Sequence, residues 1–85
     1  MKSLNEILKM DNPSEYLYKY ARENGRLELR WEKLLLSLRD PRWLYYYTRY
    51  VIKDRWPEAE EYIKKDPEWW ERYCITFNMD DYETT

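Results

Sequence analysis

The sequence predicts an all-α fold, a small bundle of about six short helices built from αα-hairpin repeats with a period of about 26 to 28 residues. Asp40-Pro41 and Asp66-Pro67 stand 26 residues apart, and each is followed at the same distance by a tyrosine, Tyr47 or Tyr73. The chain has one glycine among 85 residues, and no segment alternates with the period of two that is typical of strands. A repeat of this length indicates helical units that bury their apolar faces against one another.

The first copy of the repeat is looser than the second and third. Its correspondences with the second copy are Asn12-Pro13 with Asp40-Pro41, Tyr20-Ala21-Arg22 with Tyr47-Thr48-Arg49, Gly25-Arg26 with Asp54-Arg55, and Glu32 with Glu58. The two copies agree at both ends and differ by small insertions in the middle. Chance similarity remains an alternative explanation for the first copy.

We expect a single helical-repeat domain over the whole chain. Its predicted parts are an N-terminal helix (1–11), three repeat units (12–39, 40–65 and 66–77) and a flexible acidic tail (78–85).

The first two helices are predicted from the residues that start and stop them. Ser3-Leu4-Asn5-Glu6 is a capping box, which indicates a short helix over about residues 4–10. Asn12-Pro13 ends that helix and starts the next, because proline suits the first helical position and restricts the residue before it. Gly25 then supplies the positive φ that closes the second helix.

The third predicted helix, about residues 27–39, is apolar on two sides. Leu29 and Leu36 lie opposite its main apolar stripe. A helix of this kind is normally sandwiched, so we expect it to be the central element of the bundle. Asp40-Pro41 then opens a fourth helix, which has one apolar face and one basic, aromatic face.

Prolines also open the last two helices, at Pro57 and at Asp66-Pro67. Glu60-Glu61 stands four residues before Lys64-Lys65, which predicts two surface ion pairs along the fifth helix. Cys74 falls on the apolar face of the sixth helix, where we expect a structural role rather than a reactive thiol.

The sixth helix belongs to a terminal repeat, so no following unit covers its aromatic side chains. Terminal repeats normally need a cover. We expect either that the apolar side chains of the N-terminal helix (Leu4, Ile7 and Leu8) pack there or that the chain forms a homodimer.

The composition argues against an enzyme and indicates no cofactor and no metal site. The chain has no histidine, which is the commonest general base and metal ligand. Glu58, Glu60 and Glu61 follow Pro57 directly, so they stabilise the start of a helix more readily than they bind a cation. No apolar run approaches the roughly 20 residues of a membrane span, and we expect no membrane partner.

Charge is divided unevenly along the chain. Residues 19–55 hold ten basic and five acidic residues, whereas residues 56–85 hold three and nine. The candidate binding residues lie in the basic part, on the fourth helix, and are Arg42, Tyr45, Tyr46, Arg49 and Lys53. Arginine beside tyrosine is typical of protein interfaces and also of platforms that stack nucleic-acid bases. A third interpretation is that the rings pack under a neighbouring helix and the charges are solvated.

The run Val51-Ile52-Lys53-Asp54-Arg55-Trp56-Pro57-Glu58-Ala59-Glu60, flanked by Asp-Pro pairs, resembles repeats in uncharacterised proteins of tailed phages and giant viruses. The similarity is close over residues 40–74 and loose over 12–39. It implies a viral origin and a non-enzymatic scaffold, with no catalytic residues to transfer.

From this resemblance we expect a small protein-binding module that acts in the cytoplasm of a host cell. Its partner would be a host or viral protein, and the module would inhibit a host protein or a defence system, as an anti-CRISPR-type protein does. The alternative is a nucleic-acid-binding accessory protein that uses the basic and aromatic region, residues 19–55.

Overall fold

The computed structural model describes residues 1–79, and this part of the chain contains six α-helices, one π-helical segment and no strand. The elements are α1 (Leu4–Leu8), α2 (Pro13–Asn24), α3 (Leu29–Leu38), α4 (Pro41–Tyr47), η1 (Thr48–Ile52), α5 (Pro57–Ile63) and α6 (Pro67–Thr76). The predicted all-α bundle of short helices is confirmed. Most of the predicted acidic tail, residues 80–85, lies outside the described residues.

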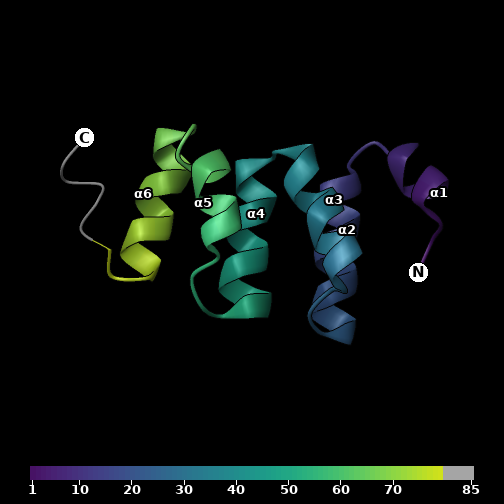
Figure 1. The fold of residues 1–85 in the computed structure, drawn as a ribbon, viewed down its shortest axis with the longest axis horizontal. Coiled ribbons are helices and arrows are strands. Elements are labelled where there is room, and N and C mark those ends of the chain that lie inside the picture. The colour runs from purple at the N-terminus through teal and green to yellow at the C-terminus, as the bar shows by residue number, and fades with distance from the viewer. Residues whose placement is uncertain (80–85) are drawn as a thin grey trace.

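The helices stand side by side in one row, with α1 at one end and α6 at the other (Figure 1). The body measures 41 × 21 × 17 Å along its principal axes. Helix α4 packs against both α2 and α6, and α3 packs against α5. The row therefore has two layers, one of α2, α4 and α6 and one of α3 and α5.

Every proline lies in the first turn of a helix, as predicted. The side chains of Asn12, Asp40 and Asp66 accept hydrogen bonds from amides in that turn, so the three predicted caps are confirmed. The capping box of Ser3 and Glu6 is also formed. These caps explain how helices of two or three turns begin at defined residues.

The central element is α4, and the prediction that the third helix occupies this place is wrong. Helix α4 contacts α2, α5 and α6, and it buries Leu44 and Tyr47 completely. In α3 only Glu32 and Leu35 are buried, while Leu29 is 65% exposed. The apolar pattern of α3 resembles that of a sandwiched helix, but the second apolar side of α3 faces outward at Leu29.

The N-terminal helix does not cover the sixth helix, so the first of the two predicted alternatives is wrong, while the homodimer stays a prediction. Helix α1 packs against α2, at the end of the row opposite α6 (Figure 1). On α6 itself Trp70 is buried, and Met79, just beyond the helix, is buried as well. The chain thus covers part of its last helix with its own following residues.

A tyrosine hydroxyl joins α4 to the hairpin before it. The Tyr47 hydroxyl donates to Glu32 Oε2 at 2.6 Å and accepts from the Leu27 backbone N–H at 3.0 Å. Arg26 completes the group, with Nε 2.6 Å from Glu32 Oε2 and Nη2 3.3 Å from Oε1. Glu32 is buried, so these two partners offset the cost of removing its side chain from water.

The same joint occurs between α6 and the hairpin before it. The Tyr73 hydroxyl donates to Glu60 Oε2 at 2.8 Å and accepts from the Trp56 N–H at 2.9 Å. Arg55 pairs with both oxygens of Glu60, at 3.1 and 3.0 Å. We call each of these groups a tyrosine–glutamate–arginine joint.

The joints correct two details of the sequence interpretation. The structural counterpart of Glu32 is Glu60 and not Glu58, because Glu60 is the carboxylate that binds the second tyrosine. Glu60 pairs with Arg55, and neither predicted pair to Lys64-Lys65 occurs among residues 1–79.

Burial and hydrogen bonding shift the pKa values in both joints. Burial first, and then the hydrogen bond to the carboxylate, raise the pKa of Tyr47 and of Tyr73 far above the ordinary phenol value. Burial acts to raise the pKa of Glu60, but the hydrogen bonds from Arg55 and Tyr73 outweigh it and hold this pKa below its ordinary value. The phenols therefore remain donors and Glu60 remains an acceptor at neutral pH.

We predict that Tyr47→Phe and Tyr73→Phe each lower the free energy of unfolding by about 1 to 3 kcal/mol, because each leaves a buried loop N–H without an acceptor. Urea denaturation measures this change. Tyr20→Phe is the matched control, since Tyr20 holds the same repeat position but its hydroxyl makes no hydrogen bond within residues 1–79. Equal losses for all three variants would contradict the role of the joints.

The second prediction concerns acid. Because folding lowers the pKa of Glu60, its contribution to stability is complete above the ordinary value of 4.5 and is lost as the pH falls through the lower, folded value. Glu60→Gln should therefore flatten the fall in stability below about pH 4.5, measured by urea denaturation between neutral and acidic pH. Glu61→Gln, on the exposed side of α5, should keep the wild-type slope. An unchanged slope in Glu60→Gln would refute this assignment.

Candidate binding surface

The layer of α2, α4 and α6 presents a continuous group of aromatic rings and arginines, which we call the arginine-aromatic face. Its residues are Tyr18 and Arg22 of α2, Arg42, Trp43 and Tyr46 of α4, Arg49 and Tyr50 of η1, and Trp69 and Arg72 of α6.

Tyr46 is the hub of the rings on this face. Its ring centre lies 5.9 Å from that of Tyr18 on α2 and 5.5 Å from that of Trp69 on α6. Trp43 and Tyr50, on the same helical stretch as Tyr46, lie 5.5 and 6.2 Å from it. Edge-to-face and tilted pairs at these distances are favourable, so one half-buried ring connects three helices.

The arginines of the face lie against these rings. The guanidinium carbons of Arg42 and Arg72 lie 5.7 and 4.9 Å from the centre of the Trp69 ring system. Arg72 also pairs with Glu68 at 3.3 Å, whereas Arg42 has no carboxylate within 4 Å in the described part of the chain. Contact with a ring face orients a guanidinium group while leaving its N–H donors available.

Two further arginines are held by phenol groups from the preceding turn. Arg22 Nη1 donates to the Tyr18 hydroxyl at 2.7 Å, and Arg49 Nη1 donates to the Tyr45 hydroxyl at 2.8 Å. Both tyrosines are buried, so each fixes the base of an exposed arginine. The hydrogen bond that Arg49 donates to the Tyr45 hydroxyl also raises the pKa of Arg49.

The π-helical segment positions Arg49 and Tyr50. The Lys53 N–H donates to the Thr48 carbonyl at 2.8 Å across five residues, and Lys53 then takes a φ of 63° that ends the helix. In a regular α-helix Tyr50 would lie on the same face as the buried Tyr47, three residues before it, but Tyr50 is 39% exposed. Single π-helical turns inside α-helices occur frequently at functional sites.

The five predicted binding residues do not all lie on this surface. Arg42, Tyr46 and Arg49 belong to the arginine-aromatic face. Tyr45 is only 2% exposed; it packs on Trp69, and its hydroxyl also bonds to Thr76 at 2.9 Å. Lys53 is exposed and makes no ion pair or ring contact within residues 1–79.

Sequence reasoning missed the contributions of α2 and α6 to this face. A signal for Arg22 was present, because Tyr18-x-Tyr20-x-Arg22 matches Tyr45-x-Tyr47-x-Arg49 in the repeat alignment. The third copy breaks the pattern, with Ile75 in the place of the arginine. No sequence signal distinguishes Trp69, which is on the face, from its buried neighbour Trp70.

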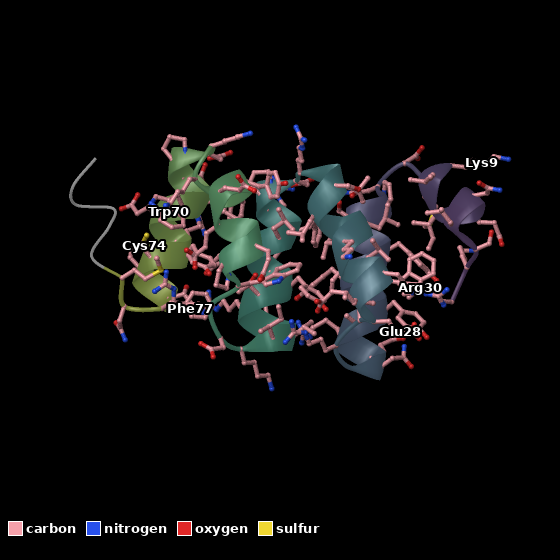
Figure 2. All side chains as sticks on the ribbon, viewed as in Figure 1. Lys9, Glu28, Arg30, Trp70, Cys74 and Phe77 are labelled. Carbon is pink, nitrogen blue, oxygen red and sulfur yellow. The ribbon has the colours of Figure 1, made fainter. Side chains whose placement is uncertain are left out.

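Outside the arginine-aromatic face, the described residues include a buried cysteine and an open groove. Within the described residues no group of three or more carboxylate, cysteine or histidine side chains could hold a metal ion. Cys74 is fully buried on α6, between the labelled Trp70 and Phe77 (Figure 2). An open groove of about 730 Å³ lies between residues 9–12, which connect α1 to α2, and α2 itself, and is lined by mixed charges and by Tyr16 and Tyr20.

Among residues 1–79, no helix is both long enough and apolar enough to cross a bilayer. Comparisons of the chain with protein-family models, with curated proteins and with solved structures find no match.

Proposed function

We propose that this chain is a protein-binding module and that the arginine-aromatic face is its binding surface. The observation that supports this most is the exposure of arginines that have no carboxylate partner within residues 1–79, beside half-buried rings spread over three helices. Arginine, tyrosine and tryptophan are the residue types most enriched at energetic hot spots of protein interfaces.

Pre-orientation of these side chains supports the same proposal. A free arginine loses rotamer freedom when it binds, and this loss lowers affinity. Here rings and buried phenols already restrict Arg22, Arg42 and Arg49. Less entropy is then lost on binding, and the guanidinium N–H groups that face solvent remain free to contact a partner.

For the partner we propose a host protein that the module inhibits, in the manner of an anti-CRISPR-type protein. The resemblance of residues 40–74 to phage and giant-virus repeats supports this choice of partner. A nucleic-acid-binding accessory protein is the alternative, and the arginines stacked on rings favour it. Against it stands the formal net charge of −2, which opposes binding of a long polyanion.

The test is recovery of a partner from nuclease-treated host lysate on the immobilised chain. We expect Arg42→Glu to abolish recovery, because reversing the charge of a hot-spot arginine should cost about 2 kcal/mol or more. Arg30→Glu is the matched control. Arg30 also lies over a tryptophan ring, 5.1 Å from the centre of Trp31, but on α3 in the other layer (Figure 2).

Two outcomes would overturn the proposal. If Arg42→Glu and Arg30→Glu recover the same partner equally, the arginine-aromatic face is not the binding surface. If nuclease treatment removes the partner that untreated lysate provides, the alternative of nucleic-acid binding takes its place. Thermal unfolding followed by circular dichroism confirms beforehand that both variants are folded.

A further inference from the structure

Two arginines from different helices lie against one exposed ring. The guanidinium carbon of Arg22, in the last turn of α2, is 5.2 Å from the centre of the Tyr50 ring. That of Arg49, in η1, is 5.0 Å from the same centre. The separation of the two guanidinium carbons therefore cannot exceed the sum of these two distances. The two groups are held this close although their positive charges repel each other.

Neither of these arginines has a counter-charge in the described part of the chain. Four other arginines, Arg26, Arg30, Arg55 and Arg72, lie within 4 Å of a carboxylate. Within residues 1–79 no such carboxylate lies near Arg22 or Arg49. Their fixed partners are neutral, namely the hydroxyls of Tyr18 and Tyr45 and the ring of Tyr50.

We propose that Arg22, Arg49 and Tyr50 form an anion clamp that binds acidic side chains of the protein partner. This inference rests on the proposed function and adds to it the chemistry that the partner must present. A carboxylate that meets a guanidinium group forms charge-assisted hydrogen bonds, often two in parallel. It also removes the repulsion between the two arginines, both of which lie against the ring of Tyr50.

The spacing suits two carboxylates on one face of a helix. Side chains one helical turn apart have their Cβ atoms about 5 to 6 Å apart. Two glutamates in this arrangement can each reach one guanidinium group of the clamp while the stretch between them packs on Tyr50. The partner segment we infer is thus a helix with acidic residues one turn apart.

The repeat itself argues for a short acidic segment rather than for a nucleic-acid strand. Arg22 and Arg49 hold equivalent positions on neighbouring helices, but the equivalent position on α6 is Ile75, which is 59% exposed. The row of equivalent cations therefore ends after two helices, and Arg72, which α6 does contribute to the face, is paired with Glu68. A strand of regularly spaced phosphates would gain from a third cation in register, whereas a pair of carboxylates needs two.

The test is a titration monitored by NMR of the arginine side-chain Nε–Hε groups in the full chain. The main probe is an alanine-rich helical peptide of about 16 residues with two glutamates one turn apart. A peptide with glutamines at both positions and a short oligothymidylate are the comparison probes. We expect saturable shifts at Arg22 and Arg49 with the glutamate peptide only, and none at Arg30.

Variants test the same clamp. Arg22→Gln and Arg49→Gln should each weaken binding of the glutamate peptide about tenfold, the change expected when a charge-assisted hydrogen bond is lost. Arg49→Lys keeps the positive charge but removes the planar guanidinium group, which can donate two parallel hydrogen bonds to a carboxylate. This variant should therefore lose most of the affinity for the glutamate peptide. Arg30→Gln, on α3, should bind as the wild type does.

Several results would refute the proposal that Arg22, Arg49 and Tyr50 form an anion clamp. Equal binding of the glutamate and glutamine peptides, equal shifts at all exposed arginines, or no binding of any probe would each show that no clamp for carboxylates exists. Tighter binding of oligothymidylate would assign the site to phosphates. If Arg22→Gln and Arg49→Gln still recover a partner that Arg42→Glu loses, the proposed function stands and the clamp alone fails.

Discussion

The rest of this structure depends on the two hydrogen bonds of a buried tyrosine hydroxyl. The hydroxyl accepts one from a loop N–H and donates the other to a carboxylate that is paired with an arginine. An 85-residue chain buries only about 60 to 65% of its unfolded surface, so each buried contact between its short hairpins weighs heavily on its stability. Tyr47 and Tyr73 each satisfy a buried loop amide and a carboxylate in one group. In the described residues no buried side-chain nitrogen or oxygen lacks a hydrogen-bond partner.

The joints also determine which side chains of α4 reach the surface. With Tyr47 committed to the joint, the helical rotation of about 100° per residue turns Tyr46 and Tyr45 toward α2 and α6. Three consecutive tyrosines thus have three roles. Tyr47 connects hairpins, Tyr45 holds Arg49 from below, and Tyr46 links the rings of the exposed face.

The sequence predicts the helices better than it predicts their packing. Proline and the side-chain acceptor before it act locally, so three helix starts follow from neighbouring residues alone. The counterpart of Glu32 could not be found by counting, because the first copy has two more residues than the second between this carboxylate and the next Asp-Pro pair. The exposed side of α3 and the burial of Tyr45 depend on contacts between helices, which a single-helix pattern does not contain.

The π-helical segment links the buried joints to the exposed arginines. The joints anchor the chain at Tyr47 and again at Arg55 and Trp56, eight and nine residues later, whereas Arg26 and Leu27 follow Tyr20 by six and seven. The second copy must therefore accommodate two extra residues between its anchors. Part of that length goes into the wider turn of η1, which carries Arg49 and Tyr50 toward Arg22 on α2. The segment from Tyr47 to Trp56 is held at both ends by buried hydrogen bonds. These bonds define the position of the exposed Arg49 beside Arg22 without making either arginine part of the core.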